Sequence, residues 1–240
     1  MPGIIVSDTS FTFNMYTKKQ VAQTIDHAVL KPENTDADLQ QNAKMCIENG
    51  VFSMCVKPCD IKAAKELLKK SDVKVSCVLS FPHGADATPV KAFQAKQAIE
   101  DGTDEIDMVM NIGKFLSGDW EYVVEDIKAV VDVAHQHGVL VKVIQESGHL
   151  TLEQVAKACE LSYEAGADFV KTSTGFGPGK ATPEIIEVMV KTVGDRMMVK
   201  PSGGIRTWED AVAFLIQGAD RLGIGSTEAV LNGAKAEGSY

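Results

Sequence analysis

The chain has 240 residues, of which 45% are apolar and 24% charged, and its formal net charge is −9. These proportions are typical of a globular protein and exclude disorder, collagen and coiled coil as the main class. A protein that binds polyanions is normally basic, so the acidic balance argues against nucleic acid or an anionic membrane as the main partner. A local basic pocket for a phosphate stays compatible with it.

Targeting and redox signals point to the cytoplasm. No apolar run approaches the roughly 20 residues of a membrane span, and no basic segment precedes a long apolar one at the N-terminus. The five cysteines are an odd number, and no second pair completes a zinc site. Reduced core thiols in a cytoplasmic protein are therefore expected.

Short β-branched runs alternate with longer helical patterns along the chain. Strands are predicted at 24–27, 51–56, 73–79, 105–109, 139–145, 168–172, 197–200 and 221–225. Several of these runs are apolar apart from a single polar residue, which suits parallel strands that are covered on both faces.

Helical patterns fill the gaps between the strands, and one of them, at 119–137, carries an apolar stripe. The threonines expected to cap helices are Thr35, Thr88, Thr151, Thr182 and Thr207. Pro89 and Pro183 are expected at the first helical position, and Thr151 with Gln154 fits a capping box. The glycines predicted to end helices in a left-handed conformation are Gly50, Gly102, Gly138, Gly166 and Gly218.

Eight strand–helix units predict an α/β protein with a single (β/α)8 TIM barrel. The alternative is an open doubly wound sheet, which would usually carry a G-x-G-x-x-G phrase after its first strand, and none stands there. No linker or change of composition marks a boundary. Residues 1–240 are thus expected to form one domain, with 1–20 as an N-terminal extension or helix.

Polar residues at the C-terminal ends of the strands are the candidates for an active site, because that end of such a barrel carries the chemistry. They are Asp26, His27, Cys55, Lys57, His83, Asp107, Asn111, Glu146, Lys171, Thr172, Ser173 and Lys200.

Two lysines inside apolar strands carry the strongest chemical signal. Burying the ammonium groups of Lys171 and Lys200 is costly, and an adjacent cation makes one of them easier to deprotonate. A neutral amine in an apolar pocket is a nucleophile toward carbonyls, which is the Schiff-base arrangement. In the structural alternative, both lysines form ion pairs with strand carboxylates such as Asp107. A third strand lysine, Lys142, belongs either to a charge network inside the barrel or to the structure alone.

Glycine-rich loops after three consecutive strands predict a phosphate site. Gly175 lies in the first loop, Gly203 and Gly204 in the second, and Gly225 with Ser226 in the third. Phosphate sites in TIM barrels are commonly built from the last two of these loops, and glycines let backbone amides approach the anion. Ordinary turns between strands and helices are the alternative.

Six phrases of the sequence resemble, in the same order, those of the deoxyribose-phosphate aldolase family of class I aldolases. They are IDHAVLKP (25–32), SFPHG (80–84), DEIDMVMNIG (104–113), VKVIQES (141–147), DFVKTSTG (168–175) and VKPSGGIRT (199–207). The resemblance runs from about Ile25 to the C-terminus. It implies the reversible cleavage of 2-deoxy-D-ribose 5-phosphate to acetaldehyde and D-glyceraldehyde 3-phosphate, a step of deoxyribose phosphate catabolism, without a metal or other cofactor.

The resemblance also implies roles for individual residues. Lys171 forms the Schiff base, and Asp107 with Lys200 relays protons. Asp26 and Cys55 line the substrate pocket. Phosphate falls to Thr172, Gly175, Gly203, Gly204, Gly225 and Ser226. A C-terminal tyrosine assists proton transfer in some members, which makes Tyr240 a candidate relay, and Phe176 stands where some members carry a lysine.

Two other functions stay open. A metal-dependent aldolase could gather His27, His83 and His149 at the mouth of the barrel, since imidazoles suit zinc. A sugar-phosphate-binding barrel without catalysis would lack the lysine pair or Asp107, and all three residues are present. The expected partners are a phosphosugar and aldehydes, with neither nucleic acid nor membrane. A homodimer is one expected assembly, although the sequence does not determine the oligomeric state.

Overall fold

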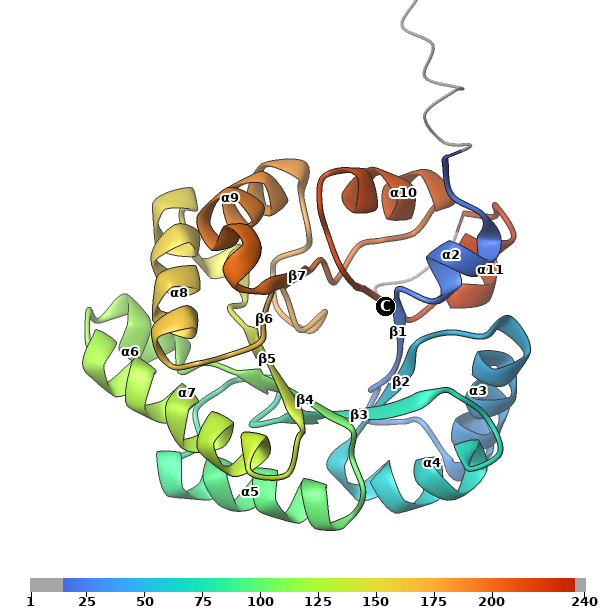
Figure 1. Ribbon diagram of the computed structural model, residues 1–240, viewed down its shortest axis with the longest axis horizontal. Coiled ribbons are helices and arrows are strands. Elements are labelled where there is room, and N and C mark those ends of the chain that lie inside the picture. Colours follow the sequence, from blue (N-terminus) through green and yellow to red (C-terminus); the bar gives the residue numbers. More distant parts are fainter. Residues whose placement is uncertain (1–14, 236–240) are drawn as a thin grey trace, which may run out of the picture.

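The computed structural model describes residues 15–235, and in it eight parallel strands form a barrel with helices outside them (Figure 1). The strands are β1 (Ile25–Val29), β2 (Ser53–Val56), β3 (Lys74–Leu79), β4 (Glu105–Val109), β5 (Leu140–Ile144), β6 (Phe169–Lys171), β7 (Met198–Lys200) and β8 (Leu222–Ile224). Each strand lies within two residues of its prediction at both ends, and β4 matches at both. The predicted (β/α)8 barrel is confirmed.

The barrel closes between β7 and β8 by a few contacts instead of a full ladder. The paired strands follow the order β7-β6-β5-β4-β3-β2-β1-β8. Ser202, just after β7, forms an isolated parallel bridge with Gly223 in β8, and the amide of Gly223 donates to the carbonyl of Pro201 at 2.8 Å. The open sheet considered as an alternative is therefore wrong.

An outer ring of helices covers the strands (Figure 1). The α-helices are α2 (Lys18–Ala22), α3 (Asp36–Asn49), α4 (Ile61–Leu68), α5 (Thr88–Glu100), α6 (Ile112–Leu116), α7 (Trp120–His135), α8 (Leu152–Glu164), α9 (Pro183–Val193), α10 (Trp208–Ile216) and α11 (Thr227–Leu231). Short 3-10 turns are η2 (Pro58–Asp60), η3 (Ser147–His149) and η4 (Gly194–Arg196). Helix α2 spans the end of the expected N-terminal extension, whose residues 1–14 lie outside the described part of the chain.

Most of the predicted helix ends are confirmed. Thr35, Thr151, Thr182 and Thr207 are N-caps whose side chains accept a first-turn amide. The five predicted glycines all have a positive φ, between 64° and 103°. The prediction for Thr88 is wrong, because Ala87 is the N-cap and Thr88 is the first helical residue, so that Pro89 comes second. The Thr88 hydroxyl instead donates to the buried carboxylate of Asp126 at 2.8 Å.

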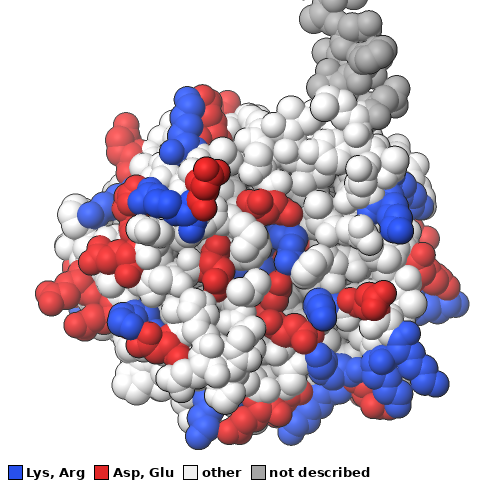
Figure 2. Space-filling model, viewed as in Figure 1, with Lys and Arg blue, Asp and Glu red and all other residues white. Residues whose placement is uncertain are grey.

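Apolar side chains fill the space between the strands and the helices, whereas the barrel interior holds charged ones. All five cysteines lie within residues 15–235 and are free, and four of them are buried. Across residues 15–235, every helix is too short or too polar to span a bilayer. Figure 2 shows acidic and basic side chains interspersed over the face that it presents, with basic ones gathered over α4.

Candidate active site

Three lysines meet one aspartate inside the barrel. The Nζ atoms of Lys171 and Lys200 lie 2.8 Å and 2.7 Å from Oδ2 of Asp107, and Nζ of Lys142 lies 2.8 Å from Oδ1. All four side chains are at most 1% exposed. The strand register explains the meeting, because Lys171 pairs with Lys200 across β6 and β7, and Asp107 pairs with Lys142 across β4 and β5.

A second set of charges lies next to these residues. Lys200 Nζ is 2.5 Å from Asp26 Oδ2, and Arg221 donates to Asp26 Oδ1 at 2.9 Å and to Glu105 at 3.0 Å. Lys142 Nζ is 2.5 Å from Glu105. The seven side chains form one continuous group, here called the charge cluster. Its members are Asp26, Glu105, Asp107, Lys142, Lys171, Lys200 and Arg221.

The charge cluster keeps the carboxylates of Asp26 and Asp107 ionised. Burial alone would raise the pKa of Asp107, but Lys142, Lys171 and Lys200 hold it well below the ordinary value. Burial likewise opposes ionisation of Asp26, yet the neighbouring cations lower its pKa. Lys142 shows the converse, since burial would lower its pKa but three carboxylates raise it well above the usual range. Asp107 therefore stays a carboxylate, and Lys142 stays a cation.

Gly223 makes room for the side chain of Lys200. Glycine 223 lies in β8, and a Cβ there would sit 3.4 Å from Lys200 Cε and 2.7 Å from the Ser202 hydroxyl oxygen. A larger residue would push the Lys200 side chain or the loop after β7. The absence of a side chain at Gly223 therefore leaves space inside the barrel for Lys200 and for the loop after β7.

The wall of the mouth beside the charge cluster is apolar. Cys55 packs with Leu30 and Val78, and Phe81 lies against the same group. Burial, and then Asp107, raises the pKa of the Cys55 thiol, so it stays neutral. Phe176, from the loop after β6, meets Phe81 edge to face with ring centroids 5.4 Å apart.

The loops after β6 and β7 hold each other in place. Thr172 Oγ1 donates to the Ser202 carbonyl at 2.8 Å and accepts the Ser202 amide at 2.9 Å. Gly203 and Gly204 are both left-handed, with φ of 81° and 79°. The stem of Lys180 lies over Gly204, because a Cβ on that glycine would be 3.0 Å from Lys180 Cβ.

A small cavity adjoins the third glycine loop. It has a volume of about 140 Å³ and is lined by Gly225, Phe176, Lys31, Asn34 and Asn42, among others. Ser226 follows Gly225 and precedes α11. The structure thus brings the loops after β6 and β8 to one side of the mouth.

Other strand-end candidates have local roles. Glu146 has a left-handed φ of 50° and accepts the amide and hydroxyl of Thr174. Asn111 caps α6 by accepting the Lys114 amide at 3.1 Å. Lys57 donates to the Asn34 carbonyl at 3.1 Å. These side chains shape the loops around the charge cluster.

The three histidines do not form a metal site. His27 Nδ1 lies 2.9 Å from Thr227 Oγ1, and its Nε2 lies 2.7 Å from Asn42 Oδ1. Burial lowers the pKa of His27 to about 4, so the ring is neutral. His83 and His149 are exposed. Between residues 15 and 235, no group of three or more His, Cys, Asp or Glu side chains could hold a metal ion.

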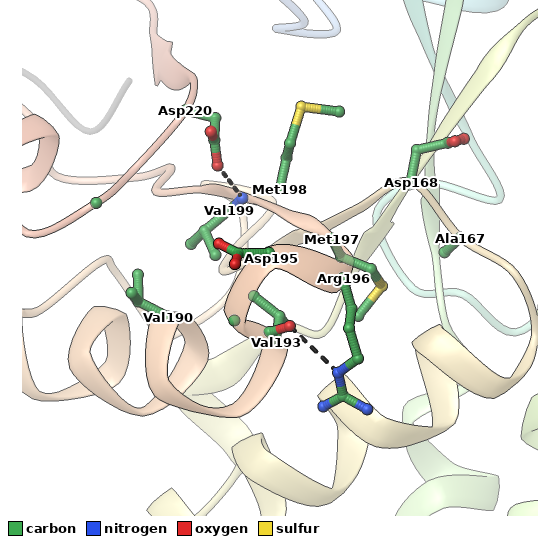
Figure 3. A pocket seen from close by; sticks show the side chains of 12 residues that line it. Ala167, Asp168, Val190, Val193, Asp195, Arg196, Met197, Met198, Val199 and Asp220 are labelled. Atoms are coloured by element: carbon green, nitrogen blue, oxygen red, sulfur yellow. Dashed lines mark hydrogen bonds between the residues drawn. The ribbon is translucent and has the colours of Figure 1, made fainter.

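A cavity of about 640 Å³ lies at the opposite end of the barrel, where β6, β7 and β8 begin (Figure 3). Three of its polar side chains have structural partners. Asp220 accepts the Val199 amide at 2.8 Å, Asp168 accepts the Val141 amide at 2.8 Å, and Arg196 pairs with Glu160 at 2.8 Å. Active sites of TIM barrels lie at the other end, so this cavity is not the candidate.

Sequence reasoning missed two members of the charge cluster, Glu105 and Arg221. The available signal was a charged residue at the edge of an apolar strand run, which is also common on a solvated surface. Tyr240 lies outside the described residues. The other predicted candidates, Lys171, Lys200, Asp107 and Asp26, meet in one place, and Lys142 joins them as the charge-network alternative expected.

This TIM barrel carries two lysines that share an ionised aspartate near the C-terminal ends of its strands. Such an arrangement is typical of enzymes in which a lysine amine attacks a carbonyl. The sequence matches the model of the DeoC/LacD family aldolases over residues 20–234, and the chain belongs to this family.

Curated relatives and a solved structure agree with this family. The chain is 52% identical over 217 residues to the deoxyribose-phosphate aldolase of Thermococcus gammatolerans, covering 90% of this chain and 96% of the relative. It is 49% identical over 223 residues to that of Clostridium perfringens, covering 93% and 99%. The tetrameric deoxyribose phosphate aldolase of Aeropyrum pernix has a TM-score of 0.86 at 30% identity, covering 93% of this chain and 94% of that one.

Proposed function

We propose that this aldolase reversibly cleaves 2-deoxy-D-ribose 5-phosphate to acetaldehyde and D-glyceraldehyde 3-phosphate, with Lys171 as the Schiff-base nucleophile. The observation that carries the proposal is the shared contact of Lys171 and Lys200 with one oxygen of Asp107, at 2.8 Å and 2.7 Å. The names of the relatives at about half identity support the substrate.

The chemistry depends on the imine that the Lys171 amine forms with the substrate. A protonated imine can accept the electron pair of a breaking carbon–carbon bond. The Lys171 amine attacks the aldehyde carbon of the open-chain sugar, and loss of water leaves a protonated imine. The C2–C3 bond then breaks, its electron pair forms an enamine, and the 3-hydroxyl loses its proton as D-glyceraldehyde 3-phosphate leaves. Protonation of the enamine carbon and addition of water release acetaldehyde and restore the amine.

The Asp107–Lys200 pair is proposed to carry the protons of these steps. Asp107 is ionised and can accept a proton, and Lys200 is its cationic neighbour at 2.7 Å. Asp26 contacts Lys200 and fixes its direction, while Cys55 supplies a neutral apolar wall. A role for Tyr240 in the same relay stays a prediction.

The phosphate is proposed to bind to Gly175, Gly203, Gly204, Gly225 and Ser226. Both Gly203 and Gly204 have a positive φ, and glycines in such a loop let backbone amides approach an anion closely. Thr172 supports this loop through Ser202. Lys180, whose stem covers Gly204, offers a cation near the loop although Phe176 replaces a lysine. A homodimer and a cytoplasmic location also stay predictions.

Borohydride trapping tests the nucleophile. Reduction in the presence of acetaldehyde should attach a two-carbon adduct to Lys171, identified by peptide mass mapping. Lys171→Met keeps a similar volume and removes the amine, so cleavage should fall by several orders of magnitude and the adduct should disappear. Lys200→Met is the matched variant, and it should keep the adduct on Lys171 while turnover falls. An adduct on Lys200 in the wild-type protein, or activity lost in chelator and restored by zinc, would overturn the proposal.

A second variant tests the phosphate loops. Ser226→Asp adds a carboxylate next to Gly225, and repulsion should lower kcat/KM for the phosphorylated sugar by about tenfold or more. The same change should leave cleavage of 2-deoxyribose nearly unaltered. Ser226→Asn controls for size without charge. Equal losses with both substrates would place the phosphate elsewhere.

A further inference from the structure

The charge cluster contains more positive than negative groups. Among the described residues it holds four cationic side chains and three carboxylates, and all seven are buried. A buried excess charge is unfavourable, and it is relieved when one group changes its protonation state. The cluster is therefore more stable when one of its cations releases a proton.

The contacts indicate which cation can do so. Arginine keeps its proton in proteins, so Arg221 remains charged. Lys142 contacts Asp26, Glu105 and Asp107 and is held as an ammonium group. Lys200 contacts Asp26 and Asp107. Lys171 shares the carboxylate of Asp107 with both other lysines.

Arg221 contacts Asp26 and Glu105, whereas the three lysines contact Asp107. It lies just before β8 and faces Asp26 on β1 and Glu105 on β4. Its guanidinium also lies 3.2 Å from the ring centroid of Phe52 and 5.5 Å from that of Phe169. Two carboxylates and two aromatic rings thus hold this charge in one position.

We propose that Arg221 is a positioning residue whose permanent charge keeps the amine of Lys171 neutral and reactive. Its charge occupies Asp26 and Glu105, so that these carboxylates stabilise Lys200 and Lys142 less strongly. Without the charge of Arg221, Asp26 and Glu105 would stabilise the ammonium forms of Lys200 and Lys142 more strongly. Every lysine of the cluster would then hold its proton more tightly. The inference rests on Lys171 being the proposed nucleophile.

The pH dependence of kcat/KM for the cleavage of 2-deoxyribose 5-phosphate tests this role, because the acid limb reports protonation of the amine in the free enzyme. Arg221→Met should move that limb to higher pH by roughly one unit, the size expected for one charge about 10 Å away in a protein interior. Activity near neutral pH should fall by about tenfold and recover in alkali. Arg221→Lys keeps a cation that can itself release a proton, so its acid limb should lie between those of wild type and Arg221→Met.

A second variant that shifts the acid limb in the opposite direction keeps the test valid even if Arg221→Met fails to fold. Glu105→Gln increases the positive excess, so the acid limb should move to lower pH. The double variant with Arg221→Met and Glu105→Gln restores the original excess and should return the limb toward the wild-type position. Arg196→Met is the matched control, because Arg196 also pairs with a carboxylate and lies over an aromatic ring, Tyr163, outside the charge cluster.

The outcomes separate this inference from the proposed function. An Arg221→Met enzyme that loses activity by the same factor at every pH, with an unmoved acid limb, would overturn the positioning role. The positioning role would also be overturned if Arg221→Met and Glu105→Gln shifted the acid limb in the same direction. Borohydride adducts are mapped in every variant, and an adduct away from Lys171 would instead contradict the assignment of the nucleophile.

Discussion

Two groups of buried charges lie in different layers of the molecule. The charge cluster fills the barrel interior, whereas Lys91 on α5 and Asp126 on α7 form an ion pair 2.5 Å apart in the layer of helices. Both members of the pair are fully buried, and Lys91 also donates to the Val109 carbonyl at 3.0 Å. Within residues 15–235, the pair has one cation and one anion, whereas the cluster has four cations and three carboxylates.

The difference shows why a buried lysine alone is a weak sign of function. Lys91 has the carboxylate of Asp126 to itself, so the charges of this pair balance. Lys171 shares the carboxylate of Asp107 with two other lysines, Lys142 and Lys200. A shortage of carboxylates among buried lysines is the more informative pattern.

The largest contrast is expected from removing the carboxylate in each group. Asp107→Asn should reduce cleavage by several orders of magnitude, because the proposed proton acceptor is lost. Asp126→Asn should leave kcat nearly unchanged while it lowers the free energy of unfolding by about 3–5 kcal/mol, the usual effect of breaking a buried pair. Kinetics and urea unfolding of both variants measure the two effects. Comparable loss of kcat in both would break the distinction between the groups.

The architecture followed from the sequence because apolar runs bounded by turns mark buried parallel strands. The run at 105–109 coincides with β4. Lys171 and Lys200 were also found this way, since a charge inside an apolar run must face a special environment. The same logic located Asp107.

The inward direction of other charges could not be predicted, because it depends on how the strands pair. Asp26 pairs with Gly223 across β1 and β8, and Arg221, two residues before Gly223, lies on the same inner face. Only that register brings Arg221 to Glu105. The pairing of Lys91 with Asp126 joins residues 35 positions apart on two helices, and it also took the Thr88 hydroxyl away from its predicted cap.

The smallest effect is expected when the balanced pair is removed as a whole. Lys91→Met and Asp126→Asn each leave one buried charge without its partner, and each should destabilise the fold. The double variant leaves no charge, and the Asn carbonyl can still accept the Thr88 hydroxyl. A double-mutant cycle should therefore give a coupling energy of about 1–3 kcal/mol, with the double variant more stable than the two single losses predict.

The pH profile of the double variant for cleavage should match wild type, because the charges inside the barrel are unchanged. Additive losses of stability would mean that the two side chains do not stabilise each other. An acid limb displaced as expected for Arg221→Met would show that the helix layer and the barrel interior act as one electrostatic unit.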